Sequence, residues 1–236
     1  MTTIGVVRWT RDNLRAKLQE FSSLYEKRPI ADNRYGMRSP QMFPAWFVMQ
    51  FLRPTYIIES GTWKGQGTWF CEQASPSSEI HSIDINLESR EYISEKVTYH
   101  NWDFSWVDWS GISTEEALCL FDDHQNAVER VRFAKEQGFR RLMFDDNYPP
   151  GQGDCYSLKK AFAEGSEDAD YLRSVLRVYY EFPPVFKTRR TRWGDEWRGK
   201  KYATPRPLYE RVKAPYLQLY LDEAPTYTWI CYAELA

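Results

Sequence analysis

Carboxylates gather at two places in the sequence, each directly after a short apolar run. Asp122 and Asp123 follow the first run, and Asp145 and Asp146 follow the second. Neighbouring carboxylates repel one another unless a cation lies among them or a proton is shared. A hard divalent cation such as Mg²⁺ prefers oxygen ligands and keeps water or hydroxyl groups in its coordination shell. These four aspartates are therefore the candidate metal ligands of the chain.

A histidine follows the first acidic pair. His124 has an ordinary pKa near neutrality, so it can take a proton from a hydroxyl group. A bound cation would also lower the pKa of such a hydroxyl and orient it for attack. We therefore take His124, Asp123 and Asp122 as candidate catalytic residues, and a metal-free mechanism through His124 stays open. The alternative is that the acids cap a helix from Asn126 and that His124 lies in a solvated loop.

A glycine-rich turn is the second chemical feature. Gly61, Gly65 and Gly67 follow an apolar run, and glycine lets the chain turn sharply and approach a ligand closely. Glu59 precedes them, and because a carboxylate repels phosphate, it suits a cationic or hydroxyl-bearing cofactor. The spacing G-x-x-x-G-x-G differs from the G-x-G-x-x-G of the dinucleotide fingerprint. Asp84 ends the next apolar run, where a carboxylate can accept hydrogen bonds from two hydroxyls.

The pattern E-x-G-x-x-x-G-x-G in residues 59–67 resembles motif I of class I S-adenosylmethionine-dependent methyltransferases, particularly the small-molecule O-methyltransferases. The resemblance implies a site for S-adenosylmethionine shaped by Glu59, Gly61, Thr62, Gly65 and Gly67. It also implies that Asp84 holds the ribose hydroxyls and that Asp103 contacts the adenine amino group.

The acidic pairs are similar to those of the metal-dependent sugar O-methyltransferases of the macrocin and mycinamicin type. That family carries one Asp after the fourth strand and an Asp-Asp pair after the fifth. Asp145 and Asp146 match the pair, and either Asp122 or Asp123 matches the single Asp. The resemblance covers motifs within residues 56–156. It implies methyl transfer to a hydroxyl of a sugar, a glycan or another small molecule, with Mg²⁺ or another divalent cation.

Strands alternating with helices must position these residues. Apolar runs rich in β-forming residues predict strands at 55–59, 80–84, 97–103, 117–121 and 141–144. Helical spacing predicts helices at 11–25, 41–52, 68–74 and 126–137. The alternation predicts an α/β fold with a Rossmann-like, doubly wound, mostly parallel sheet. Ligands bind beyond the carboxyl ends of such strands, where the candidate residues lie.

The length of 236 residues is interpreted as one methyltransferase domain over residues 1–236. Residues 1–54 would form a helical N-terminal extension. Residues 179–215, in which Pro, Arg, Lys and Trp are crowded, predict an inserted lid. Residues 217–221 and 227–233 predict closing strands, paired antiparallel at the edge of the sheet.

The net charge of −2, from 31 basic and 33 acidic residues, gives no general attraction to nucleic acid, so none is expected as a partner. The basic segment 187–201 is interpreted as a solvated loop. No apolar run approaches the ~18–20 residues of a membrane span. Four scattered cysteines indicate a reducing compartment, and we expect a cytoplasmic protein. The sequence leaves open a homo-oligomer or a larger multidomain chain.

Two other functions stay open. An NAD-dependent sugar-modifying enzyme would keep the fold and change the chemistry, although the glycine spacing and Glu59 speak against it. A non-enzymatic module could instead bind a glycan or a partner through a Trp-rich face. The aromatic content of 17%, with ten Trp, fits either a core or pockets that stack on sugars.

Overall fold

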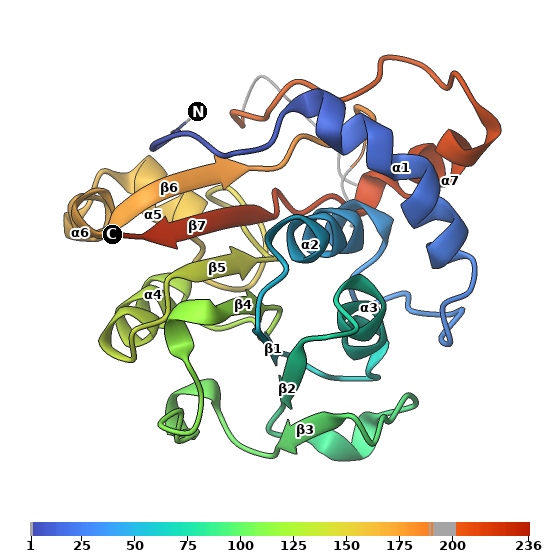
Figure 1. Cartoon of the computed structure of the whole chain (residues 1–236). Coiled ribbons are helices and arrows are strands. Elements are labelled where there is room, and N and C mark those ends of the chain that lie inside the picture. The colour runs from blue at the N-terminus through green and yellow to red at the C-terminus, as the bar shows by residue number, and fades with distance from the viewer. Residues whose placement is uncertain (1, 189, 191–201) are drawn as a thin grey trace.

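The structure is a computed structural model that describes residues 2–188, 190 and 202–236. Its strands are β1 Tyr56–Ser60, β2 Glu79–Ile83, β3 Val97–His100, β4 Ala117–Phe121, β5 Arg141–Phe144, β6 Leu176–Glu181 and β7 Cys231–Leu235. They form one sheet in the order β3-β2-β1-β4-β5-β7-β6 (Figure 1). Neighbouring strands are parallel except where β7 pairs with β5 and β6. The predicted Rossmann-like, doubly wound, mostly parallel sheet is confirmed.

Helices cover both faces of this sheet (Figure 1). One face is packed by α1 Arg11–Tyr25, α2 Ser39–Leu52 and α3 Gln66–Ala74. The other face is packed by α4 Ala127–Glu136, α5 Leu158–Glu164 and α6 Glu167–Val175. The short helix α7 Gln218–Asp222 lies near α1 and α2. Short 3₁₀ segments span Leu87–Ser89, Phe104–Trp106, Thr114–Glu116, Pro215–Leu217 and Ala224–Thr226.

The two N-terminal helices follow from local sequence signals. Helix α1 has the predicted bounds, and Thr10 caps it by accepting a hydrogen bond from the backbone N–H of Asn13 at 3.2 Å. Helix α2 begins two residues earlier than predicted, at Ser39. Pro40 is tolerated there because the first turn of a helix needs no intrahelical N–H donor.

Strand β3 is shorter than predicted, because it ends at His100 and not at Asp103. Asp103 instead caps the following 3₁₀ segment, where its carboxylate accepts a hydrogen bond from the backbone N–H of Ser105 at 2.9 Å. An Asp that bonds to nearby backbone favours a turn over a strand.

The prediction of a strand at residues 217–221 is wrong, because this stretch is helical. Leu217 and Tyr220 are both buried, and the Tyr220 hydroxyl donates to the backbone oxygen of Leu18 in α1 at 2.7 Å. A spacing of three places both side chains on one face of a helix. The partner of β7 at the sheet edge is β6, a strand that the sequence did not predict.

The predicted lid at residues 179–215 lies only partly among the described residues and stays a prediction. Its first three residues belong to β6, and residues 189 and 191–201, with most of the basic segment, lie outside the described residues. On either side of that gap, the backbone N–H of Leu208 donates to Pro184 at 2.9 Å. Val185 and Leu208 are buried in the core on the α1 side. The described flanks are therefore part of the packed domain.

Among the described helices, none has the length and apolar character that a bilayer crossing requires. The cysteines Cys71, Cys119, Cys155 and Cys231 are buried free thiols.

Candidate active site

A cavity of about 380 Å³ lies at the carboxyl ends of β1, β2 and β4. This is the edge at which open α/β sheets bind ligands. Of the residues singled out from the sequence, the cavity is lined by Gly61, Asp84, Asp103, Asp122, Asp123 and His124. Its size is at the lower end of the range for small-molecule sites.

The glycine turn joins β1 to α3, and its residue Gly61 lines the cavity. Gly61 has a φ of 106°, and a Cβ atom there would lie 2.1 Å from the backbone oxygen of Asp122. Gly65, with a φ of 87°, is the N-cap of α3, and a Cβ would lie 2.4 Å from the oxygen of Tyr92. Both positions therefore require glycine for conformation and for space.

Changing Gly61 to alanine is expected to lower the free energy of unfolding by about 1–3 kcal/mol, because a side chain is strained at this φ and meets the Asp122 carbonyl. Urea unfolding measures the change. Gly111→Ala is the control, since nothing lies within 4 Å of a Cβ at that position. Equal stability of the two variants would contradict the expectation.

Glu59 lies beneath the turn and does not line the cavity. Its Oε2 atom accepts hydrogen bonds from the hydroxyls of Thr68 at 2.5 Å and Ser82 at 2.6 Å. Its Oε1 atom lies against Gly67, where a Cβ would be 2.1 Å away. Thr62 is also buried and shares a hydrogen bond with Ser82 at 2.7 Å. Glu59, Thr62 and Gly67 thus support the glycine turn without lining the cavity.

The burial of Glu59 predicts a pH dependence of stability. Burial raises its pKa from 4.5 to about 7, although the hydrogen bonds from Ser82 and Thr68 oppose the shift. The folded state therefore keeps this proton to a higher pH than the unfolded state. The stability from this group is fully present below pH 4.5 and is lost, by about 3 kcal/mol, as the pH rises through about 7.

The measurement is urea unfolding of the parent and of Glu59→Gln on both sides of this window. The parent should lose more stability than the variant as the pH rises. Glu115→Gln, at a side chain that is 64% exposed, is the control and should behave as the parent. Identical pH profiles for the parent and Glu59→Gln would rule out this role of burial.

Asp84 is anchored at the rim of the cavity after β2. Its carboxylate accepts hydrogen bonds from the backbone N–H groups of Trp63 at 2.8 Å and Asn86 at 2.9 Å. Trp63 has a left-handed φ of 41° and lines the same cavity. Bulky residues rarely adopt this conformation, and such strain concentrates at functional sites. Asp84 is therefore held in one orientation beside the glycine turn.

Arg130, which was not among the residues predicted from the sequence, joins two of the candidate acids. This buried side chain on α4 forms two hydrogen bonds with Asp103, at 2.8 and 2.6 Å, and one with Asp123 at 2.9 Å. Asp123 also accepts from the Ser60 hydroxyl at 2.6 Å. The hydrogen bonds from Arg130, followed by those from Ser105, hold the pKa of Asp103 well below its usual range. One usable sequence signal is the position of Arg130 four residues after the N-cap Asn126.

Asp122 faces a different group of acids. Burial, followed by the neighbouring carboxylates of Asp145 and Asp146, raises the pKa of Asp122 well above its ordinary value. Donor atoms of Asp122, His124 and Asp146 lie within 4.8 Å of one another, and we call these three residues the acidic group. They are one of two candidate metal-ligand groups among the described residues. Two carboxylates and an imidazole fit a divalent cation that also holds water or hydroxyl ligands.

The structure therefore separates the two acids that the sequence left as alternatives. Asp122 lies beside Asp145 and Asp146, whereas Asp123 forms an ion pair with Arg130. Asp145 lies beside Asp122 and accepts a hydrogen bond from the Thr228 hydroxyl at 2.8 Å. Neither Asp123 nor Asp145 belongs to the group whose donor atoms converge.

His124 adopts a left-handed φ of 54° at the end of β4. Its Nδ1 atom lies 3.1 Å from Asp146 and 3.0 Å from Asp154, a residue that the sequence did not single out. Burial lowers the pKa of His124, but the carboxylates of Asp146 and Asp154 outweigh it, and the net shift is upward. The imidazole is thus held among carboxylates at the mouth of the cavity.

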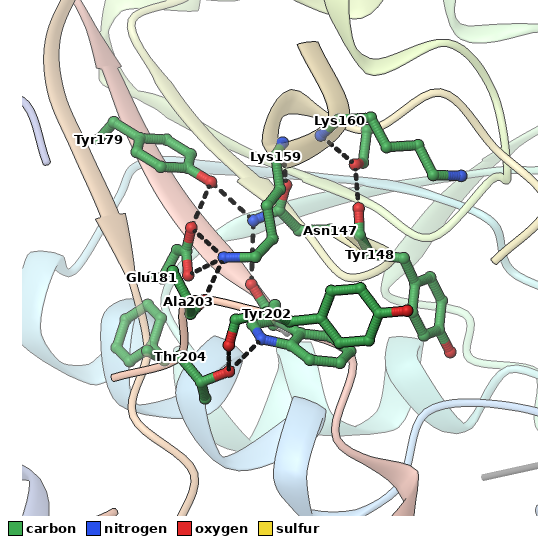
Figure 2. Close-up of polar contacts among 12 residues, drawn as sticks. Asn147, Tyr148, Lys159, Lys160, Tyr179, Glu181, Tyr202, Ala203 and Thr204 are labelled. Atoms are coloured by element: carbon green, nitrogen blue, oxygen red, sulfur yellow. Dashed lines mark hydrogen bonds and ion pairs between the residues drawn. The ribbon is translucent and has the colours of Figure 1, made fainter. Parts of the chain in front are cut away.

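A buried polar network supports the segment that follows β5 (Figure 2). The side-chain amide of Asn147 donates to the hydroxyl of Tyr179 at 2.8 Å and to the backbone oxygen of Trp229 at 3.1 Å. The Tyr179 hydroxyl donates to Glu181 at 3.0 Å, and Glu181 pairs with Lys159 at 2.6 Å. Because Asn147 directly follows Asp145 and Asp146, the network fixes their backbone to α5, to β6 and to the segment before β7.

Comparison with known proteins gives a limited result. No protein-family model matches the chain, and no curated protein sequence does. A solved structure of CmcI with Mg and SAM is 15% identical, with a TM-score of 0.47 over 86% of this chain and 75% of that one. An apo structure of CmcI is 22% identical, with a TM-score of 0.44 over 60% of this chain and 66% of that one.

An SAH-bound methyltransferase of Podospora anserina, PaMTH1, is 17% identical, with a TM-score of 0.41 over 57% of this chain and 62% of that one. This chain thus spans slightly less than two thirds of the apo CmcI and PaMTH1 chains. At TM-scores below 0.5, these likenesses establish neither a family nor an activity for the chain.

Proposed function

We propose that the chain is an S-adenosylmethionine-dependent O-methyltransferase. The observation that carries the proposal is one cavity lined by Gly61, Asp84 and Asp122, the last of which belongs to the acidic group. The turn lets a cofactor approach the backbone, and the carboxylate of Asp84 can accept hydrogen bonds from ribose hydroxyls. A transferred methyl group would then lie close to the acidic group. Methyl transfer needs mainly the alignment of an in-line attack.

The adenine end of the cofactor would lie near Asp103. Its Oδ1 atom already accepts from Arg130 and from Ser105, whereas Oδ2 accepts one hydrogen bond from the described residues, from Arg130 at 2.6 Å. A carboxylate oxygen can accept a further hydrogen bond. In this proposal Oδ2 accepts from the adenine amino group, and Arg130 orients the carboxylate.

The acidic group would hold a divalent cation and the acceptor hydroxyl. Asp122, Asp146 and His124 would be its ligands, and the cation would lower the pKa of the hydroxyl. Asp145 would orient Asp122, and Asp123 would orient Arg130. In the metal-free alternative, His124 takes the hydroxyl proton, with its imidazole oriented by Asp146 and Asp154.

The acceptor in this proposal is a hydroxyl-bearing small molecule, and within that class a sugar or glycan. Aromatic side chains support this choice, because Tyr35, Trp63 and Trp102 line the cavity and Tyr35 is 71% exposed. Aromatic faces suit the apolar faces of sugar rings and other flat ligands. The four free thiols suit a reducing compartment, and we place the protein in the cytoplasm.

The test is isothermal titration calorimetry with S-adenosylmethionine. The parent should bind saturably, and Asp84→Ala should bind at least about tenfold more weakly, because it loses charge-assisted hydrogen bonds to the ribose. Asp108→Ala is the matched control, since among the described residues this exposed Asp accepts hydrogen bonds from Ser110 alone. Absence of binding at millimolar cofactor would refute the proposal, and saturable binding of NADH instead would favour an NAD-dependent sugar-modifying enzyme.

A further inference from the structure

A second cavity of about 380 Å³ lies at the opposite edge of the sheet from the candidate active site. Its lining includes Arg141, the first residue of β5, and Arg177, near the start of β6. Arg141 lies about 13 Å along its strand from Asp145, at ~3.3 Å per residue. The cavity is on the face covered by α1 and α2, and its lining residues are all described. It is therefore separate from the cofactor cavity.

Positive charge predominates in this cavity. Arg8, Arg141 and Arg177 line it, and Glu234 is the one carboxylate in its lining. Arg177 forms an ion pair with Glu234. Among the described residues, neither Arg8 nor Arg141 has a side-chain hydrogen bond or an ion pair. The guanidinium groups of Arg8 and Arg141 can therefore bind an anion, in a chain whose net charge is −2.

Tyr232 lines the same cavity as these charged residues. Burial, followed by the charge of Glu234, raises the pKa of Tyr232, while Arg141, Arg8 and Arg177 each oppose the shift. All four charges therefore act on the same phenol, which itself lines the cavity. Guanidinium groups that gather in this way repel one another, and an anion among them removes the repulsion.

Apolar walls surround this charge. Trp9 and Phe51 line the cavity, with their ring centroids 5.5 Å apart, and Phe51 is 40% exposed. The N-terminal segment that carries Arg8 is fixed to β6, because Ile4 and Tyr179 exchange backbone hydrogen bonds of 3.4 and 2.9 Å. Gly5 lies so close to β6 that a Cβ would be 2.2 Å from the oxygen of Arg177. The cavity is therefore bounded on one side by an exposed segment that β6 holds in place through its backbone.

We propose that this cavity binds a small organic anion, with an oxyanion such as a carboxylate or phosphate on an aromatic body. Arg141 and Arg8 contact the oxyanion, because guanidinium groups match the geometry of carboxylate and phosphate. The hydroxyl of Tyr232 donates a further hydrogen bond. The aromatic body lies against the exposed ring of Phe51, which the buried Trp9 supports, and Glu234 pairs with Arg177. This site is independent of the proposed methyl transfer.

The experiment is calorimetry of the full chain with phenyl phosphate as the probe. The parent should bind it saturably, and both Arg141→Gln and Arg8→Gln should bind at least about tenfold more weakly, through loss of charge-assisted hydrogen bonds. Arg140→Gln is the matched control. It changes the neighbouring arginine, which pairs with Glu115 outside the cavity, and should leave the affinity unchanged.

Two further measurements complete the test. Inorganic phosphate should bind more weakly than phenyl phosphate, because it leaves the aromatic walls unused. The thermal unfolding midpoint of Arg8→Gln should match that of the parent, which shows that weaker binding is not a loss of fold. Absence of saturable binding at millimolar phenyl phosphate, or equal affinity in the parent and both cavity variants, would overturn the proposal.

Discussion

Changing Asp146 to asparagine is expected to lower the rate of the proposed methyl transfer by roughly two to three orders of magnitude. Asp146 is buried, and it belongs to both groups of residues whose donor atoms could meet a metal ion within the described part of the chain. Its carboxylate also lies 3.1 Å from the imidazole of His124. Loss of this charge removes an oxygen ligand and a partner of His124 in one substitution. Both the metal-dependent and the His124 mechanism therefore predict a large loss.

The measurements are turnover at saturating Mg²⁺ and the affinity for Mg²⁺. Affinity for S-adenosylmethionine should be unchanged, since Asp146 does not line the cofactor cavity. Asp108→Asn makes the same chemical change at an exposed position and should keep full activity. Turnover and Mg²⁺ affinity equal to those of the parent would exclude Asp146 from the reaction. A loss of turnover without any Mg²⁺ dependence in the parent would favour His124 as the base.

Changing Lys159 to methionine is expected to lower the free energy of unfolding by about 3–5 kcal/mol. The ammonium of Lys159 donates to both carboxylate oxygens of Glu181, at 2.7 and 2.6 Å, and to the oxygen of Ala203 at 2.7 Å (Figure 2). Burial raises the pKa of Glu181, and Lys159 opposes that shift. Without the lysine, Glu181 is left buried with the Tyr179 hydroxyl as its one remaining side-chain donor among the described residues.

Urea unfolding of matched variants measures this effect. Lys160→Met changes the next residue of α5, whose ammonium donates to backbone oxygens of Cys155 and Gly153, and should cost about 1 kcal/mol. Adding Glu181→Gln to Lys159→Met should recover much of the lost stability, because no unpaired buried charge remains. A cost for Lys159→Met no greater than that for Lys160→Met would show that the pair contributes little.

The Lys159–Glu181 pair is connected to the acidic group through hydrogen bonds. The Lys159–Glu181 pair reaches Asn147 through the hydroxyl of Tyr179, and Asn147 directly follows Asp146 (Figure 2). The buried pair therefore anchors the end of β5, where the acidic group begins. A group that holds like charges together needs such a rigid support, because repulsion among the carboxylates would otherwise spread them apart.

Much of the fold could be predicted from local sequence patterns. The bounds of α1, β4 and β5 agree with the predictions, because each element carries a complete periodic pattern and clear end signals. The glycine turn and Asp84 could be placed at one edge of the sheet, since the carboxyl ends of parallel strands meet there. The sequence also predicted that the two acidic pairs would be neighbours, and β4 and β5 are adjacent.

The secondary-structure predictions were wrong where contacts between distant segments decide the structure. Residues 217–221 are apolar enough for a strand, but contact with α1 made them helical, and β6 took the place beside β7. Short apolar runs do not distinguish helix from strand by composition, because packing against the rest of the chain decides between them.

By itself, the sequence determined a Rossmann-like sheet with a glycine turn and acids at the ends of its strands. Only the tertiary structure decided what each acid does. Asp122 and Asp123 are adjacent, yet one faces Asp146 and the other pairs with Arg130. Arg130 is 27 residues from Asp103, its second partner, so no local pattern joins them. The direction of a side chain depends on charges brought close by folding, and that information does not lie in the neighbouring sequence.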